Sequence, residues 1–318
     1  MRRLIVAQTP HEMDALKPAW EQLYCHQGKA TFFQSFLWNR LAADFFPHER
    51  PYVVLVESDS GSALIPAAIR NDSHVCLLGE ELFDYRDVLY AGEAAALASG
   101  WRALAELDLP LAMTPFRAGG ALERWNEFQI IDFCKAPRVG PGISADEFAS
   151  SHSRLGRQLR RLARAGVALA RYSGEDQRLL REIYSRKATL SNCCGNLFAD
   201  SSRVGFMLAV TAGAPAQCHI FILETASTLV AALVTFHDGN VRRFYTTYFN
   251  PAWGHYSPGL ALLFEATRLS LVEGLTCDYM TGEQDYKLRL ATDSVQLYRA
   301  QGKLPQNGER EREVSLVA

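Results

Sequence analysis

The predicted order of helices and strands repeats along the chain. Hydrophobic period and helix caps give both halves one order: strand, two helices, three strands, helix, strand, helix, strand. Matching elements begin 165 or 166 residues apart, at Tyr52 and Cys218, Glu93 and Pro258, and Leu109 and Leu275. Residue identity between the halves is low, so the repeat is one of architecture. The sequence therefore predicts two copies of one mixed α/β domain.

An additional helix separates the two copies. It is predicted over Ser144–Ala165 and begins with a capping box, in which Ser144 and Glu147 satisfy each other's backbone N–H groups. We therefore expect a first domain over residues 1–140 and a second over 141–302, with the additional helix at 144–165. The tail at 303–318 is polar and is expected to be disordered.

The composition is typical of a folded, water-soluble protein. Hydrophobic residues make up 48% and charged residues 21%, which is too apolar for a disordered chain. The formal net charge of -2 excludes a general positive field, so no DNA partner is expected. No apolar run approaches the ~20 residues needed to cross a bilayer, so no membrane span is expected.

The cysteines and histidines predict neither a disulfide framework nor a metal site. The seven cysteines are an odd number and contain no C-x-x-C pair. Cys193 and Cys194 are adjacent but lack a second pair of ligands, and the eight histidines show no ligand spacing. The N-terminus also lacks the apolar stretch of a signal peptide. We therefore expect a reduced, cytoplasmic protein that uses no metal.

Several short motifs accompany the repeated order of elements. They are Phe33-Gln34-Ser35-x-x-Trp38, Leu64-Ile65-Pro66, Asp84-Tyr85-x-Asp87, Arg154-x-x-Arg157-x-x-Arg160-Arg161, Tyr248–Pro251 followed by Ser257-Pro258-Gly259, and Gly282-Glu283-x-x-Tyr286-Lys287. With these motifs, the chain resembles the tandem-GNAT proteins related to the CelD (cellulose-biosynthesis type) acetyltransferases and, more distantly, the FemABX peptidyltransferases. The resemblance spans nearly the whole chain. It implies an α/β fold with an α+β mixed sheet, made of two tandem GNAT (acyl-CoA N-acyltransferase) folds.

The resemblance implies a donor site in the second copy. In a GNAT fold, the acyl-CoA pyrophosphate lies at the N-terminus of the helix after the fourth strand, where unpaired N–H groups and the helix dipole favour an anion. The family pattern there is Gln/Arg-x-x-Gly-x-Gly/Ala, and this chain departs from it with Tyr256 at the first position. The residues expected to bind acetyl-CoA or another acyl-CoA are Tyr256, Ser257, Gly259, Leu260 and Ala261. Ser-Pro-Gly is also a common way to begin a helix, which is the structural alternative.

The equivalent segment of the first copy differs. It reads Ala91-Gly92-Glu93, and a carboxylate at that place would repel an anion. We therefore expect the first copy to be non-catalytic and the second to carry the reaction.

Titratable residues follow the predicted strand Leu275–Tyr279. Transfer of an acyl group to an amine needs a base for the amine, stabilisation of the carbonyl oxygen and an acid for the thiolate. We expect Tyr286 to be the acid, and either Glu283 or Asp278 to be the base, directly or through water. Lys287 is expected to stabilise developing negative charge. The structural alternative is that Asp278 caps a turn and the others are solvated or pack by their stems.

Arginines recur along one face of the additional helix. Five arginines lie between Arg154 and Arg164 with no acidic residue among them, so they repel one another unless an anion or a carboxylate surface meets them. We expect contact with an anionic acceptor, such as a sugar nucleotide or acidic glycan, or with carboxylates of the first copy, while a solvated face is the alternative. The residues expected to bind the acceptor are Asp84, Tyr85, Arg154, Arg157, Lys187 and Tyr248.

Three functions remain open at this point. The leading one is an acyl-CoA-dependent N-acyltransferase, with O-acylation left open, acting on a small-molecule or saccharide acceptor in polysaccharide or envelope biosynthesis. The second is a FemABX-like peptidyltransferase that uses aminoacyl-tRNA, against which the near-neutral charge argues mildly. The third is a non-catalytic scaffold or binding subunit, which the departure at Tyr256 keeps open.

Overall fold

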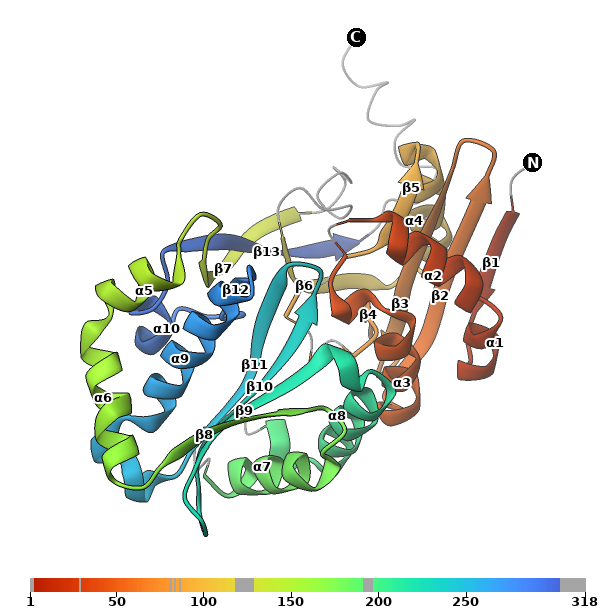
Figure 1. Ribbon diagram of the computed structural model, residues 1–318. Helices are drawn as coiled ribbons and strands as arrows, with labels where there is room; N and C mark the ends of the chain where they lie inside the picture. The colour runs from red at the N-terminus through yellow and green to blue at the C-terminus, as the bar shows by residue number, and fades with distance from the viewer. Residues whose placement is uncertain are drawn as a thin grey trace. The chain divides into compact units, whose positions relative to one another are not determined.

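The computed structural model describes residues 3–28, 30–79, 82, 84–85, 87–117, 129–190 and 197–303. Helices and strands are interspersed along the chain, as expected for a mixed α/β fold (Figure 1). The chain forms two compact units, one of Met1–Cys134 with Gln296–Ala318 and one of Lys135–Val295. The domain boundaries expected from the sequence stay a prediction, because compactness does not test whether each part folds alone.

The first unit is a mixed sheet with helices. Its strands are β1 (Arg3–Ala7), β2 (Glu49–Ser58), β3 (Gly61–Arg70), β4 (His74–Leu77), β5 (Leu89–Gly92), β6 (Pro110–Arg117) and most of β13 (Asp293–Lys303). Its helices are α1 (Pro10–Asp14), α2 (Lys17–His26), the 3-10 helix η1 (Phe32–Gln34), α3 (Phe36–Phe45) and α4 (Ala94–Ala105). The strand order is β1-β2-β3-β4-β6-β13, and β5 pairs with β3.

The second unit repeats this arrangement. Its strands are the end of β7 (Gln129–Val139), β8 (Ala168–Ser173), β9 (Cys218–Glu224), β10 (Leu229–Asp238), β11 (Val241–Phe249) and β12 (Thr276–Asp278). Its helices are α5 (Ala145–Ser151), α6 (Ser153–Arg164), α7 (Gln177–Leu190), α8 (Ser201–Gly213), α9 (Pro258–Val272) and α10 (Asp285–Leu288), with 3-10 helices η2 (Leu197–Ala199), η3 (Pro215–Gln217) and η4 (Pro251–Tyr256). The strand order is β8-β9-β10-β11-β12-β7.

The two units share one pattern of strand pairing. In each, four strands pair antiparallel in chain order, and a helix then leads to a fifth strand that pairs parallel with the fourth, as β6 does with β4 and β12 with β11. The sixth strand comes from elsewhere in the chain: β13 pairs with β6 in the first unit, and β7 pairs with β12 in the second. The repeat of element order predicted from the sequence is therefore present as a repeat of topology.

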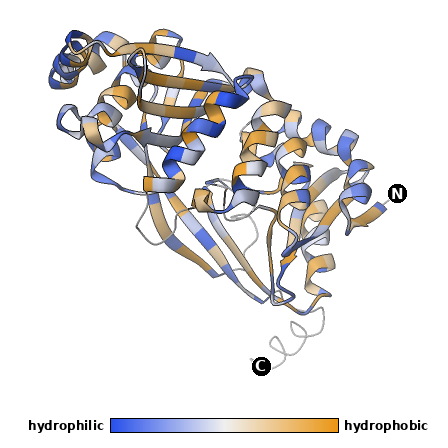
Figure 2. Cartoon of the chain, turned by 90° about the horizontal axis from the view of Figure 1, so that it is seen from below, coloured by the Kyte–Doolittle hydropathy of each residue, from blue (hydrophilic) through white to orange (hydrophobic). Residues whose placement is uncertain are grey.

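Strands β9 and β10 of the second unit are buried on both faces. Along β9, Phe221 and Leu223 pack in one core with Leu262 and Ala266 of α9, while the alternate residue Ile222 is buried on the opposite face. Helices α5, α6 and α9 cover the first face, and α7 and α8 lie over the other (Figure 1). Hydrophobic residues follow the strands and the helix surfaces beside them (Figure 2). Side chains from helices on both faces of the sheet can therefore reach β11.

The additional helix differs from its prediction. Instead of one helix over 144–165, the chain forms α5 and α6, with a break at His152. The imidazole of His152 lies 2.9 Å from the carbonyl oxygens of both Phe148 and Arg289. The backbone of His152 leaves the helical region at φ -115° and ψ 32°. The chain changes direction between α5 and α6 at this tertiary contact, and the local hydrophobic periodicity does not predict it.

Three sequence features lie outside the described residues: the last helix in the predicted order of the first copy, expected near Trp125, the pair Cys193–Cys194 and the tail after Lys303. Among the helices that are described, none has both the length and the apolar character that crossing a bilayer requires.

Candidate functional site

The N-terminus of α9 presents two unpaired backbone donors. Ser257 precedes the helix in a left-handed conformation, with φ 48°, and its side chain makes no capping hydrogen bond. Pro258 has no N–H, and the N–H of Ala261 donates to the Ser257 carbonyl at 3.1 Å. Within the described chain, the N–H groups of Gly259 and Leu260 have no acceptor. Two free donors at the positive end of a 15-residue helix form a site suited to an anion.

The ring of Tyr256 supports the segment before α9. It lies 5.7 Å from the ring of Trp253, and the guanidinium of Arg161 lies over it, 5.5 Å from the centroid. A cation near an aromatic face at this range is attracted by the ring quadrupole. Where the family pattern has Gln or Arg, this chain therefore has an aromatic residue with an arginine of α6 beside it.

Strands β11 and β12 diverge next to this helix end. They pair in parallel over only three residues, from Val241 with Thr276 to Arg243 with Asp278. β11 continues to Phe249, so its residues 244–249 have no partner in β12. The end of this open edge lies beside α9, because a Cβ added at Gly259 would be 3.5 Å from the side chain of Phe249. The end of β11 that is unpaired with β12 thus lies beside the free N–H groups.

Thr247, on the open part of β11, joins two of the predicted site residues. The Nζ of Lys187, from α7, donates to the Thr247 carbonyl at 2.8 Å. The phenol of Tyr286, from α10, forms a hydrogen bond with the Thr247 side chain. Burial raises the pKa of Tyr286, and the hydrogen bond with Thr247 only partly offsets this. Tyr286 is 36% exposed, so its burial is only partial. Because its pKa is raised and not lowered, the phenol holds its proton at neutral pH.

Lys287 lies close to Lys187. Its Nζ donates to the carbonyl of Thr281 at 2.6 Å and approaches that of Met280 at 3.4 Å, and the residue is only 8% exposed. Burial and the positive charge of Lys287 lower the pKa of Lys187. The positive charge of Lys287 on α10 thus acts on the amine of Lys187 on α7.

The two carboxylates predicted as bases have different surroundings. Asp278 forms an ion pair with Arg243 at 2.7 Å, and it accepts the N–H of Met280 at 2.8 Å. Arg243 is also paired with Asp238. Glu283 is exposed in the loop before α10. Asp278 is therefore engaged in the turn after β12, and Glu283 is open to solvent.

The residues expected to bind the acceptor are not all gathered in one place. Arg154 and Arg157 are exposed on α6, and neither forms an ion pair with any residue that the structure describes. Tyr248 is buried on β11, where its hydroxyl is hydrogen-bonded to Arg186 of α7. Asp84 and Tyr85 belong to the first unit. There, the ring of Tyr85 is buried and has the Arg117 guanidinium 5.3 Å from its centroid.

Two residues of this site were missed in the sequence. No local sequence pattern marks Thr247, because its place in the site depends on where the pairing of β11 with β12 ends. Arg161 belongs to the basic helix, but its position beside Tyr256 depends on how α6 packs against η4. Lys187 did carry a signal: Leu180, Ile183 and Tyr184 form the buried face of α7, and position 187 continues that face.

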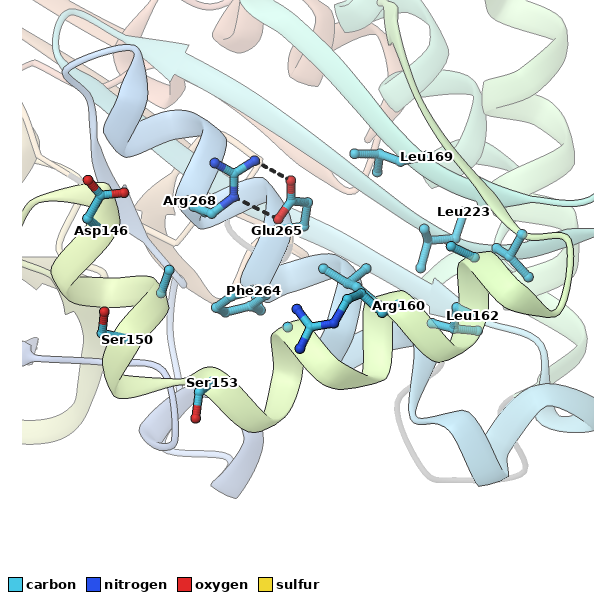
Figure 3. Close-up of a pocket in the computed structure, with 15 residues that line it drawn as sticks. Asp146, Ser150, Ser153, Arg160, Leu162, Leu169, Leu223, Phe264, Glu265 and Arg268 are labelled. Carbon is cyan, nitrogen blue, oxygen red and sulfur yellow. Dashed lines mark hydrogen bonds and ion pairs between the residues drawn. The ribbon is translucent and has the colours of Figure 1, made fainter.

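A separate cavity of about 720 Å³ lies between α5, α6 and α9 (Figure 3). Glu265 and Arg268 form a bidentate ion pair at its wall, at 2.6 and 2.9 Å. None of its lining residues is among the predicted site residues. Among the side chains that the structure describes, no three His, Cys, Asp or Glu residues gather as metal ligands.

Solved structures similar to this chain share its fold over almost its full length. FemX has a TM-score of 0.59 at 9% identity, covering 99% of this chain and 99% of that one. L-PGS from Bacillus licheniformis has a TM-score of 0.56 at 11% identity, covering 97% and 96%. A tandem GNAT protein from the clavulanic acid biosynthesis pathway has a TM-score of 0.53 at 11% identity, covering 95% and 98%. At such identities, the likeness concerns the fold.

The second unit also matches a family at the level of sequence. Residues 149–288 match the model described as an acetyltransferase (GNAT) domain. Comparison with curated proteins gives no match. The matched range contains α7, β11, α9 and α10, which carry the site described above. The predicted GNAT fold and acyltransferase class are therefore confirmed, and residues 149–288 of the chain form an acetyltransferase (GNAT) domain.

Proposed function

We propose that the chain is an acyl-CoA-dependent N-acyltransferase whose reaction takes place in the second unit. One observation carries this proposal: β11 and β12 diverge beside the helix end at which Gly259 and Leu260 offer free N–H donors. A pyrophosphate would bind those donors, with Tyr256 and Ser257 before them and Ala261 one turn into α9. The acyl-bearing arm would then enter the opening beside residues 244–249.

Each group of the site has a proposed task in the transfer. Tyr286 would protonate the departing thiolate, since it keeps its proton at neutral pH and lies beside the open edge of β11. Lys287 would stabilise negative charge on the thioester oxygen. Asp278 and Glu283 stay candidate bases from the sequence. The amine nitrogen forms the new bond to the acyl carbon, the C–S bond breaks, and CoA leaves as a thiol.

The proposed acceptor is a small or sugar-like amine, of the kind used in polysaccharide or envelope biosynthesis. The support comes from α6, whose exposed arginines suit an anionic acceptor such as a sugar nucleotide. Arg154 and Arg157 would contact it, and Lys187 and Tyr248 would face it from α7 and β11. Asp84 and Tyr85 of the first unit stay proposed acceptor residues.

Binding of acetyl-CoA tests the donor. Thermal unfolding of the full chain with acetyl-CoA should show stabilisation, of about 2.7 kcal/mol at a ligand concentration 100 times the Kd. Isothermal titration with acetyl-CoA and with CoA should give similar affinities, because most contacts are made to the shared pyrophosphate. An absence of binding by either measurement would remove acyl-CoA as the donor.

A second candidate is a FemABX-like transfer from aminoacyl-tRNA. The observation in its favour is the same row of exposed arginines on α6, which could bind a phosphate backbone. Retention of the chain by aminoacyl-tRNA, with affinity that falls steeply as salt rises, would favour this candidate if acetyl-CoA does not bind. A chain that binds neither donor would be a scaffold or binding subunit.

A further inference from the structure

Lys187 lies where α7 would ordinarily carry an apolar side chain. Leu180, Ile183 and Tyr184 form the fully buried face of the helix, and residue 187 follows seven positions after Leu180. Its Nζ lies 5.8 Å from the centroid of the Phe198 ring and donates to the Thr247 carbonyl. No carboxylate forms an ion pair with it in the part of the chain that the structure describes. A lysine held this way has no counterion to keep it charged.

Of the described groups that face Lys187, the ammonium of Lys287 favours its neutral amine, and none is a carboxylate that would favour its charged form. From α10 it faces the ammonium of Lys287, from β11 the carbonyl of Thr247, and from η2 the ring of Phe198. The carbonyl accepts a hydrogen bond from either form of the amine, and the ring attracts a cation only weakly at this distance. Burial and the charge of Lys287 both lower the pKa of Lys187.

Thr247 places this amine opposite the phenol of Tyr286. Leu233, which faces α9, pairs directly with Thr247, so the Thr247 side chain lies on the α9 face, where it meets Tyr286. Lys187 comes instead from α7, on the other face. Tyr286 and Lys187 therefore approach Thr247 from the two sides of one strand, where β11 is still paired with β10 but no longer with β12.

We propose that Lys187, as a neutral amine, takes the proton from the ammonium group of the acceptor. This inference rests on the proposed function. The carboxylate candidates are less suited, because Asp278 is bound to Arg243 and Glu283 is exposed. Lys187 would be a catalytic residue and not only a contact for the acceptor.

The proton and bond changes balance as follows. The acceptor R–NH3⁺ gives one proton to the Nζ of Lys187 and becomes R–NH2. Its nitrogen lone pair attacks the thioester carbon, a C–N bond forms, the C–S bond breaks, and the second nitrogen proton is released. CoA takes up a proton as it leaves, from Tyr286, and the released proton restores the phenol. Lys187 then returns its own proton to solvent.

Paired substitutions separate a base from a mere positive charge. Lys187→Met and Lys187→Arg should each lower kcat/KM with acetyl-CoA and glucosamine by about 10²- to 10⁴-fold, because neither side chain can accept a proton at neutral pH. Lys17→Met, in the first unit and exposed, is the matched control and should leave kcat/KM unchanged. Activity restored by Lys187→Arg would overturn the proposal, since charge alone would then suffice.

Direct titration covers the case in which glucosamine is not an acceptor. The chain has six lysines, so reductive ¹³C-methylation gives few signals, and the Lys187→Arg variant identifies the one to follow. The amine of Lys187 should titrate below the ordinary value of about 10.4, and Lys287→Met should raise its pKa. A signal that titrates at or above the ordinary value would overturn the proposal.

The two proposals fail in different ways. If acetyl-CoA binds but Lys187→Arg stays active, the inference about Lys187 fails and the donor assignment stands. If acetyl-CoA does not bind, the donor assignment fails whatever the pKa of Lys187. For active enzyme, kcat/KM should rise with pH up to the pKa of Lys187, because only the neutral amine accepts a proton, and Lys287→Met should move this rise to higher pH.

Discussion

Helices α4 and α9 follow equivalent strands in the two units, but they begin in different surroundings. At α4, the N–H of Glu93 donates to the Ser60 carbonyl at 3.0 Å, so the β2–β3 turn lies against the helix start. A Cβ added at Gly61 would be 2.6 Å from the carbonyl oxygen of Ala91. At α9, the N–H of Ser257 donates instead to the Gly254 carbonyl of η4 at 2.9 Å, and a Cβ added at Gly259 would meet only the Phe249 side chain, at 3.5 Å. The first two donors are free in both helices within the described chain, so the two helix starts differ in the backbone packed against them.

This difference shows how one topology can be closed in one copy and open in the other. We expected Glu93 to block the first copy by charge, but its side chain is exposed and makes no capping bond. The backbone is instead close-packed there: β5 pairs with β3 from Gly61 to Leu64, and a Cβ at Gly61 would be 2.8 Å from the N–H nitrogen of Glu93. That the first unit is non-catalytic stays a prediction, now with a steric reason.

The largest expected effect concerns the acid. Tyr286→Phe should lower kcat by about 10²- to 10⁴-fold and leave the Kd for acetyl-CoA nearly unchanged, because the phenol acts on the departing thiolate. Tyr90→Phe, on the strand before α4, is the control and should leave kcat unchanged. Steady-state kinetics and calorimetry measure the two quantities. Unchanged turnover in Tyr286→Phe would remove this residue from the mechanism.

Charge at the two helix starts should act differently. Gly259→Asp should weaken acetyl-CoA binding by about 10²-fold, because a carboxylate would face the pyrophosphate, although an acidic residue in the first turn favours the helix itself. Ala94→Asp at α4 is the matched substitution and should leave the Kd unchanged. Calorimetric titration checks both. Equal losses in the two variants would contradict the assignment of the donor to α9.

A methyl group added before α4 should destabilise the protein, whereas one added at the start of α9 should not. Gly92 has φ 80°, and a Cβ there would overlap the Ser60 carbonyl oxygen. Gly92→Ala should therefore lower the free energy of unfolding by about 1–2 kcal/mol, without affecting acetyl-CoA binding. Gly259→Ala, whose Cβ meets Phe249 at 3.5 Å, should leave stability unchanged or raise it slightly. Denaturant titration distinguishes these outcomes.

The smallest expected effect concerns α6, which precedes only the second unit. Arg157→Ala should weaken binding of UDP-glucosamine by about threefold at low salt, because an exposed ionic contact contributes at most ~1 kcal/mol. The difference should vanish at high salt, where such charges are screened. Affinity measured against ionic strength tests this. If the affinity of Arg157→Ala equals that of the unmodified protein at every salt concentration, the arginines do not bind the acceptor and their role is structural.

Much of the fold was predictable from local signals. Ser257-Pro258-Gly259 indicated the start of α9 correctly, because Pro is pre-organised for the first helical position. The prediction of one helix over 144–165 was wrong, because His152 bonds to the carbonyl of Arg289, which is 137 residues away. Lys187 was a weaker candidate in the sequence, since its role depends on a carbonyl 60 residues further along.

The sequence by itself determined the repeated order of elements, the apolar faces of its helices and the free N–H groups at α9, because caps and periodicity act within a few residues. Tertiary structure decided the rest. It completed each sheet with β13 or β7, ended the β11–β12 pairing after three residues, and brought Lys187 and Tyr286 to Thr247. These arrangements depend on packing between segments far apart in the chain, which no local pattern specifies.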